Sequence, residues 1–387
     1  MKKLICLKCK QVHLQTTDNK CPVCGGANLH DFRNSDNFLR EKVEVVLEHR
    51  KKLGLQGLVG GLSCIIINTE PENQIVTVND FLRFTGLKVA EVFEDSDFRT
   101  VVLKTDNSAD FLIRSRKAEN PFLELNDYPK SRHLPNTRME TLVFKTTDLE
   151  KYVSIQKDRG IEFLTDNIIK CDNFSFIQTA PSEYTGNSIG LIQWHRNEGK
   201  YSSSQSKSLN LNFNKPDNSV LKNIKYLDHA ATRVRAEDRD TAIIEFMNLT
   251  NYNFDFAIYV KVFNSITNVA RLSAKDFAMV FTSGISGYID DEQSGPTEKF
   301  VHNYGPRVHH LAFWTEAIDK TVSALKNDGM DFLIDLVGSP EEGLKQIFSC
   351  PSENTMLINE YIHRYGDFDG FFTKSNVTLL TGATSKQ

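Results

Sequence analysis

Three stretches in the second half of the chain carry residue types that can hold a metal ion. Asp228 and His229 come first, His309 and His310 follow, and Glu360 lies near the end, each within a strand-like pattern. A single histidine in an apolar strand is more often a hydrogen-bonded core residue than a ligand. Two histidines and one carboxylate from three strands, however, make up the facial triad that binds Fe(II) and leaves positions open. We therefore predict an iron site formed by His229, His310 and Glu360.

The strand that carries the histidine pair is the clearest element of the sequence. Residues 308–314 (V-H-H-L-A-F-W) show the period-two pattern of a strand that uses both faces. An amphipathic helix is predicted from Thr315 to about Lys326, closed by the turn N-D-G. Because neighbouring side chains of a strand point to opposite faces, we predict that His309 faces away from His310 and is structural.

The same strand, helix, turn and strand occur earlier in the chain. Residues 139–164 align without a gap with residues 308–333, and each copy lies in a larger unit of strand, helix and three further strands. Such internal repetition indicates duplicated structural units. The sequence therefore predicts an α+β protein built from duplicated βαβββ modules, each half folding a curved sheet.

Within this alignment, the first half has the same predicted strands and helices as the second half but lacks the metal ligands. Each ligand is replaced by another residue: Thr141 for His310, Cys64 approximately for His229, and Gln193 or Trp194 for Glu360. We therefore predict that the first half is a structural partner and that only the second half binds iron.

Four cysteines near the start of the chain form two C-x2-C pairs: Cys6 and Cys9, and Cys21 and Cys24. Each pair can present two sulfurs to one ion, and the Gly25-Gly26 dipeptide gives such a turn its backbone freedom. Four thiolates around a tetrahedral ion are typical of a structural zinc ribbon. A rubredoxin-like iron site has the same ligands, and a redox dithiol is a further alternative. The ribbon is favoured over the dithiol because both pairs lie in one short, loop-rich segment.

The composition is that of a soluble globular protein of two or three domains, with 387 residues, 40% hydrophobic, 25% charged and a net charge of −4. This mild acidity gives no general attraction to nucleic acid or to anionic membranes. The richest apolar run, residues 58–67, is too short to span a bilayer, and the start M-K-K-L-I-C lacks the apolar region of a secretory signal. We expect a cytoplasmic protein, and its seven cysteines suit a reducing compartment.

These patterns divide the chain into five segments. We predict a zinc ribbon over residues 1–35, a linking helix over 36–60, a first βαβββ-repeat domain over 61–196, a Ser/Asn-rich linker over 197–222, and a second βαβββ-repeat domain over 223–387 that carries the iron site.

The motifs resemble those of the vicinal-oxygen-chelate superfamily, and within it 4-hydroxyphenylpyruvate dioxygenase and its hydroxymandelate-forming relatives. The matching stretches are residues 227–229 (L-D-H), 308–312 (V-H-H-L-A), 346–348 (Q-I-F), 359–364 (N-E-Y-I-H-R) and 370–376 (G-F-F-T-K-S-N). The resemblance covers about residues 60–380 and leaves the ribbon outside it. The ligand motifs are moderately specific together and weak singly.

This resemblance implies a non-haem Fe(II) dioxygenase that oxidises an aromatic 2-oxo acid with O2 and decarboxylation. His229, His310 and Glu360 would bind the iron, and Gln346 would contact the substrate in the reaction. A lid near the C-terminus would complete the substrate-binding pocket through Phe368, Phe371, Phe372 and Asn376.

Two other functions remain open at this point. Residues 296–300 (P-T-E-K-F) depart from the Q-I-Q-E-Y segment of these dioxygenases, and the span between His310 and Glu360 is shorter, as in extradiol-type relatives. Extradiol cleavage of a catechol uses the same ligands and is the alternative enzyme activity. A non-catalytic binding protein with the same fold is the other alternative. The ribbon is a candidate docking module for a protein partner, and self-association is left open.

Overall fold

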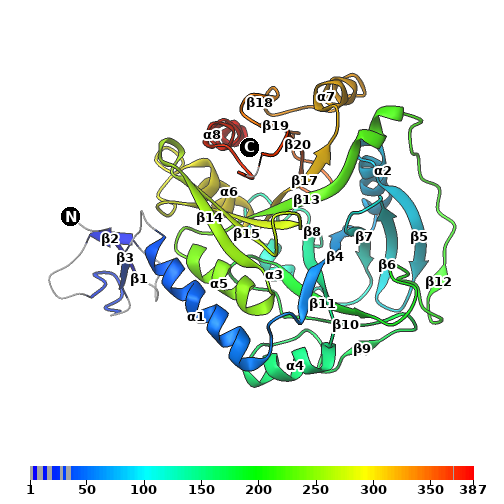
Figure 1. The fold of residues 1–387 in the computed structure, drawn as a ribbon, viewed down its shortest axis with the longest axis horizontal. Helices are drawn as coiled ribbons and strands as arrows, with labels where there is room; N and C mark the ends of the chain where they lie inside the picture. The colour runs from blue at the N-terminus through cyan, green and yellow to red at the C-terminus, as the bar shows by residue number, and fades with distance from the viewer. Residues whose placement is uncertain (1–2, 7–11, 15–19, 27–28, 32–35, 369) are drawn as a thin grey trace.

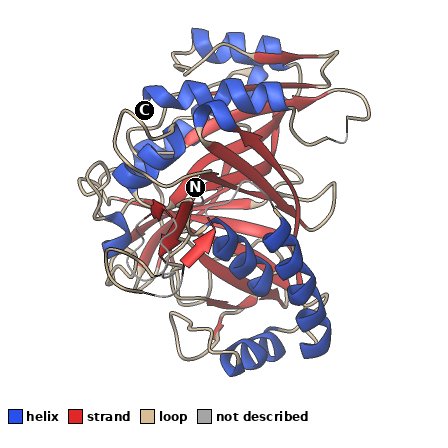
Figure 2. Ribbon diagram, turned by 90° about the vertical axis from the view of Figure 1, so that its left-hand side faces the viewer, coloured by secondary structure: helices blue, strands red, loops and turns tan. Residues whose placement is uncertain are grey.

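The computed structural model describes residues 3–6, 12–14, 20–26, 29–31, 36–368 and 370–387. Two large mixed sheets occupy the middle of the molecule, with helices arranged around them (Figures 1 and 2). A small three-stranded sheet lies at the N-terminal side of the long helix α1 (Figure 1). Its strands are β1 (Lys3–Cys6), β2 (Val12–Leu14) and β3 (Leu29–Asp31), and α1 spans Asn37–Leu53.

The first large sheet has nine strands in the order β12-β5-β6-β7-β4-β8-β11-β10-β9. Its elements are β4 (Val59–Thr69), α2 (Gln74–Phe84), β5 (Lys88–Glu94), β6 (Phe98–Lys104), β7 (Asp110–Arg116), α3 (Leu123–Asn126), β8 (Arg138–Thr146), α4 (Leu149–Asp158), β9 (Ile169–Lys170), β10 (Phe174–Gln178), β11 (Ser188–Trp194) and β12 (Lys207–Ser208). Strands β4 and β8 begin its two βαβββ units and pair antiparallel at its centre.

The second large sheet repeats this plan in eight strands, in the order β14-β15-β16-β13-β17-β20-β19-β18. Its elements are η1 (Ser219–Asn223), β13 (Ile224–Arg233), α5 (Arg239–Leu249), β14 (Asn253–Val260), η2 (Lys261–Phe263), β15 (Ser265–Arg271), β16 (Ala278–Gly284), α6 (Pro296–Tyr304), β17 (Arg307–Thr315), α7 (Ile318–Asn327), β18 (Val337–Ser339), β19 (Leu344–Phe348), β20 (Ile358–Arg364), α8 (Lys374–Ala383) and η3 (Thr384–Lys386). The predicted duplicated βαβββ architecture is confirmed.

The two modules share one apolar core. The β-branched run of β4 alternates between faces, so that Ile65 and Ile67 enter this shared core while Cys64 and Ile66 face the concave side of the first sheet. Rings from the two modules meet directly, as where Phe111 stacks on Phe313 with centroids 5.9 Å apart. Burial of this common core fixes the modules against each other, and each concave face keeps a separate cluster of side chains.

The concave face of the first module is filled by aromatic side chains. Phe174, Trp194 and Tyr201 pack edge-on or tilted against one another, with centroids 5.2 to 6.3 Å apart. Tyr201 comes from the segment that follows β11, and this segment then pairs with β5 through β12. The predicted linker thus runs along the first sheet as a strap before it enters the second module.

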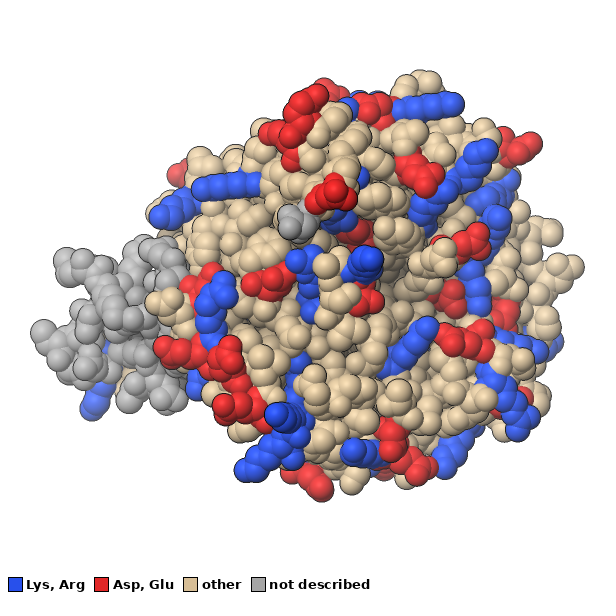
Figure 3. Space-filling model, viewed as in Figure 1, with Lys and Arg blue, Asp and Glu red and all other residues tan. Residues whose placement is uncertain are grey.

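In the described part of the chain, no helix is long and apolar enough to cross a membrane. Basic and acidic side chains are interspersed over the face seen in Figure 3, without a broad area of either sign. This mixture agrees with the small net charge of −4.

Candidate metal centre

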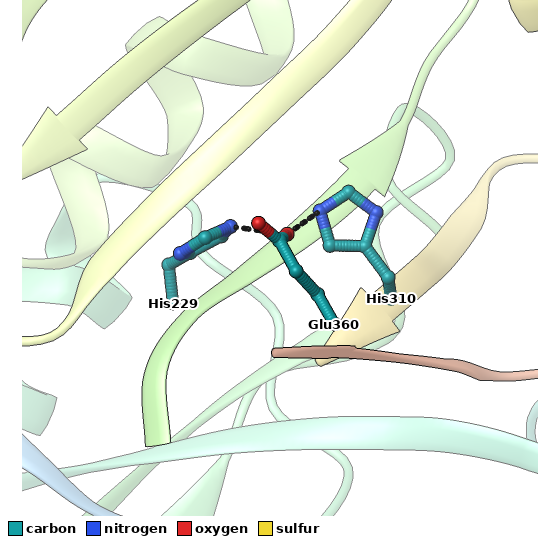
Figure 4. A group of neighbouring side chains, drawn as sticks. All are labelled: His229, His310 and Glu360. Atoms are coloured by element: carbon teal, nitrogen blue, oxygen red, sulfur yellow. Dashed lines mark hydrogen bonds and ion pairs between the residues drawn. The ribbon is translucent and has the colours of Figure 1, made fainter. Parts of the chain in front are cut away.

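The three predicted ligands lie on adjacent strands of the second sheet. His229 on β13 pairs with Ala312 on β17, and Ala312 pairs with Glu360 on β20, so these residues form one row across the sheet. His310 lies two residues before Ala312 on the central strand. Glu360 Oε2 is 3.1 Å from His229 Nε2 and 3.3 Å from His310 Nε2, so both imidazoles converge on one carboxylate (Figure 4).

Two β-bulges at the junction of β13 and β17 place a second polar side chain beside each histidine. Asp228 is the extra residue between the pairs at Leu227 and His229, and His309 is the extra residue between the pairs at Val308 and His310. A bulge puts two consecutive residues opposite one partner and interrupts the alternation of faces. His309 and His310 therefore line the same cavity. The prediction that His309 faces away from His310 is wrong, because it assumed an unbroken pleat.

The extra residue Asp228 orients His229. Its Oδ1 lies 2.7 Å from His229 Nδ1, and Arg364 donates two hydrogen bonds to its carboxylate, at 2.6 and 2.9 Å. Burial raises the pKa of Asp228, but Arg364 and His229 outweigh this effect and hold it well below its usual range. A carboxylate on Nδ1 leaves Nε2 directed at the metal position, the arrangement that commonly supports a ligating histidine.

Without a metal ion, His229 and His310 have opposite proton preferences. Burial lowers the pKa of His229, but Glu360 and Asp228 outweigh it and raise this pKa to about 9. Burial and the charges of His309, His229 and Arg233 hold the pKa of His310 well below its usual value. Because a histidine must be neutral to bind a metal, metal binding at this site releases the proton of His229.

The second imidazole, His310, has a hydrogen-bonded partner of its own. Its Nδ1 lies 2.9 Å from His309 Nδ1, and His309 Nε2 lies 3.0 Å from Gln387 Oε1. The chain of bonds is satisfied when His309 Nε2 donates to Gln387 and His309 Nδ1 accepts from His310. This tautomer leaves the lone pair of His310 Nε2 free for a metal.

The carboxylate of Glu360 is held by an amide relay. Gln346 on β19 donates from Nε2 to Glu360 Oε1 at 2.6 Å, and Asn376 on α8 donates from Nδ2 to Gln346 Oε1 at 3.1 Å. The relay fixes Oε1 and leaves Oε2 between the two imidazoles. Gln346 thus acts on the ligand as well as lining the cavity, a contact that the sequence did not indicate.

A cavity of about 50 Å³ opens beside the triad. This volume is smaller than that of typical small-molecule sites, roughly 300–1,000 Å³. Helix α8 forms one wall, and it begins where Thr373 accepts a hydrogen bond from the backbone N–H of Asn376. The remaining walls come from strands of the second sheet and from α6, and the lining residues are Arg233, Ser265, Thr267, Val280, Thr282, Thr297, His309, His310, Gln346, Phe348, Glu360, Phe372, Val377, Leu380, Thr381 and Thr384.

The predicted pocket residues divide between this cavity and the outside. Phe372 lines the cavity and contacts His229 edge-on, with centroids 5.2 Å apart. Phe371 also packs on His229 but, together with Phe368, lines a separate outer cleft. Asn376 reaches the site only through Gln346. The structure thus brings Phe372 and Gln346 to the cavity, while Phe368 lies away from it.

The three side chains fit a divalent metal. One ligand atom from each residue lies within 4.8 Å of the other two, and all three residues are buried. Two imidazole nitrogens and one carboxylate oxygen are the donor set of the facial triad that binds Fe(II), and the cavity lies beside them. His229, His310 and Glu360 could therefore hold Fe(II).

The corresponding place in the first module holds no such set. Cys64 pairs with Val143 as His229 pairs with Ala312, and Thr141 occupies the position of His310. Gly190, however, pairs with Val143 as Glu360 pairs with Ala312. The prediction of Gln193 or Trp194 at this position is wrong by three or four residues, because unequal turns shift the register after the aligned block.

Only part of the predicted ribbon lies in the described structure. The backbone turns tightly from Cys21 to Gly26, where two hydrogen bonds of 2.8 and 2.9 Å close the turn. Cys6 ends β1, and Cys9 lies outside the described residues.

Comparisons with known proteins place the fold. No protein-family model and no curated protein matches the sequence. Among solved structures, a triple mutant of 4-hydroxymandelate synthase from Streptomyces coelicolor superposes with a TM-score of 0.65 at 16% identity, over 85% of this chain and 99% of the synthase. The chain has the fold of that synthase. A xylose isomerase-like TIM barrel/4-hydroxyphenylpyruvate dioxygenase fusion protein also matches, with a TM-score of 0.60 at 13% identity, over 90% of this chain and 58% of the fusion.

Proposed function

We propose that the protein is a non-haem Fe(II)-dependent dioxygenase that oxidises an aromatic 2-oxo acid with O2 and releases CO2. The observation that supports this most strongly is the buried triad of His229, His310 and Glu360 beside a cavity, in a fold shared with 4-hydroxymandelate synthase. Fe(II) bound there would supply the coordination of substrate and O2 and the oxidising chemistry.

The chain's own residues prepare this site. Asp228 and Arg364 orient the first imidazole, His309 orients the second, and Gln346 holds the carboxylate in place. Phe372 and the α8 side chains Val377 and Leu380 form an apolar part of the cavity wall. Such fixed ligands and a dry, shaped cavity are what a protein contributes to metal-ion catalysis.

Oxygen uptake with anaerobically reconstituted protein tests the proposal. We expect one Fe(II) per chain, with O2 consumption matched by CO2 release on aromatic 2-oxo acids. Glu360→Gln should lose iron and turnover, because the neutral amide no longer offsets the metal's charge. Cys64→Ala changes the first-module counterpart of His229 and should leave both intact. O2 consumption on catechols without CO2 would favour extradiol cleavage instead, and absence of Fe(II) binding would leave a non-catalytic binding protein.

We further propose that the cysteine pairs hold one structural zinc ion: Cys6, Cys9, Cys21 and Cys24. The tight turn from Cys21 to Gly26 supports this, because a turn closed by backbone hydrogen bonds can present two sulfurs on one side. The ribbon is then a candidate surface for a protein partner.

A further inference from the structure

Arg233 is a buried cation in the wall of the cavity, without an acidic partner among the described residues. It is 4% exposed and lines the same cavity as Glu360 and His310. Its polar contact among the described residues is 3.5 Å from Nη1 to the Pro296 carbonyl oxygen, at the limit of a hydrogen bond. Its guanidinium carbon also lies 4.7 Å from the centroid of the Phe300 ring.

Two other buried arginines, Arg50 and Arg138, are fully engaged, whereas buried Arg307 also has an Nε without an acceptor among the described residues. Arg50 donates to the carbonyl oxygens of Met247 and Tyr252 and to Asn253, and Arg138 donates to four oxygen atoms. Both hold the structure together through these bonds. Arg233 instead leaves most of its five N–H donors without an acceptor among the described residues, although burial of an unpaired charge is unfavourable.

The position of Arg233 relates it to the metal site. His229, Ala231 and Arg233 alternate along β13 and pair in unbroken register with β16, so all three face the concave side. Four residues of a strand span about 13 Å. Arg233 therefore extends from the same wall as the first ligand, further along the cavity.

The side chains around this end of the cavity are hydroxylic. Thr282 is the strand partner of Arg233, and Ser265 Oγ lies 3.2 Å from Thr297 Oγ1 nearby on the lining. Hydroxyl groups can donate to an anion but cannot neutralise an arginine. Phe348 and Phe372 add two aromatic rings to the same lining.

A count of formal charges also leaves Arg233 without a compensating negative charge. Fe(II) with Glu360 and two neutral imidazoles carries one positive charge, which the carboxylate of a 2-oxo acid would neutralise. The charge of Arg233 would then remain. Burial lowers the pKa of Arg233 to about 9, so the guanidinium is still charged at neutral pH.

We propose that Arg233 binds a second acidic group of the substrate, and hence that the substrate is a dianion with one acidic group at each end. This inference rests on the proposed function, because the first acidic group is the one at the metal. The planar guanidinium can bind a carboxylate through two parallel hydrogen bonds. Arg233 is thus a specificity-determining residue, and 2-oxo acids with a neutral far end are poorer ligands.

Binding to matched pairs of acids tests the proposal. The probes are 4-carboxyphenylpyruvate against 4-methylphenylpyruvate, and 2-oxoadipate against 2-oxohexanoate, titrated calorimetrically into anaerobic Fe(II)-loaded protein. In at least one pair the diacid should bind on the order of 10- to 100-fold more tightly, as expected for charge-assisted hydrogen bonds. Arg233→Met should reduce this preference below about threefold and leave the affinity for the neutral-ended acid nearly unchanged.

Two further variants separate recognition from bulk charge and from folding. Arg235→Met removes the same charge two residues further on, where the guanidinium pairs with Asp238 at 3.1 Å outside the cavity, and should keep the full preference. Arg233→Lys keeps a charge but loses the fork and should give an intermediate preference. If Arg233→Met does not fold, the wild-type protein and Arg233→Lys still decide the outcome.

The absence of a diacid preference in the wild-type protein would overturn the inference, and so would a preference that survives in Arg233→Met. Oxygen uptake on the same acids separates this result from the proposed activity. Arg233-dependent diacid binding without O2 consumption would refute the dioxygenase and leave the anion site standing. O2 consumption on neutral-ended acids without any diacid preference would do the reverse.

Discussion

Replacing Asp228 should weaken metal binding by an amount that depends on whether one acceptor oxygen remains. Oδ1 accepts from His229 and Arg364, whereas Oδ2 accepts from Arg364 alone. In Asp228→Asn the amide nitrogen must face a donor at either place. The amide nitrogen would face one donor at the position of Oδ2 and two donors at the position of Oδ1. The orientation with the amide oxygen at the position of Oδ1 is therefore favoured. His229 then retains a neutral acceptor on Nδ1 and keeps the tautomer that frees Nε2 for the metal.

The expected magnitudes follow from this difference. Loss of such a supporting partner typically lowers metal affinity by about 10- to 100-fold. Asp228→Asn should fall near the lower end, about 10-fold, because only the charge is lost. Asp228→Leu leaves His229 Nδ1 without an acceptor and Arg364 without its carboxylate, so we expect about 100-fold, together with a lower unfolding temperature.

Anaerobic Fe(II) titration against a competing chelator measures these affinities. Asp276→Asn is the matched control, because Asp276 lines the outer cleft with Asp228 but is exposed and contacts no ligand. Equal affinity in wild type and Asp228→Leu would refute the orienting role of Asp228. A larger loss in Asp228→Asn than in Asp228→Leu would show that the amide turns its nitrogen toward His229, contrary to the hydrogen-bond count.

Three other changes have distinct expected results. Replacement of Cys6, Cys9, Cys21 and Cys24 by serine should remove about one zinc ion per chain, measured by elemental analysis, while iron is retained. An unchanged zinc content would contradict the proposed zinc ribbon. His309→Leu removes the acceptor of His310 Nδ1 and should lower Fe(II) affinity by roughly 10-fold, the cost of one unsatisfied buried donor, whereas wild-type affinity would show that His310 needs no such partner. Burial raises the pKa of Glu245 to about 7, so the folded state binds more protons than the unfolded state, and the free energy of unfolding falls as pH rises from about 4.5 to 7. In urea unfolding, Glu245→Gln should make the free energy of unfolding less dependent on pH, by at most about 3 kcal/mol over this range. An unchanged pH dependence in Glu245→Gln would contradict this prediction.

The parts of the site that were predictable from sequence depend on regular periodicity. Strand alternation and the repeated block identify β8 and β17, and they place Thr141 and His310 at equivalent positions. The convergence of the three ligands follows once the strands are ordered as in the first half. The repetition alone did not place Glu360, because its first-module counterpart was misassigned; the residue types and the resemblance of residues 227–229, 308–312 and 359–364 completed the choice.

The errors come from features that interrupt this periodicity. The bulge at His309 adds one residue without any sequence signal of its own, since an adjacent pair of histidines reads as ordinary alternation. Gly190 was misplaced because loop lengths differ between the halves. Arg233 was not identified, since a lone arginine at a strand end is usually solvent-exposed, and its lack of a partner is visible only in three dimensions.

The strap that carries Tyr201 fills the concave face of the first module. The hydroxyl of Tyr201 donates a hydrogen bond to Asp110 at 3.0 Å, beside Cys64, which is the first-module counterpart of His229. Because the strap is covalently joined to β11 and also pairs with β5, its effective concentration at this place is at least of millimolar order. A free metabolite of ordinary cellular concentration competes poorly against such a tethered occupant. One half of the duplicated fold thus has a cavity beside its triad, while the corresponding face of the other half is filled by the chain itself.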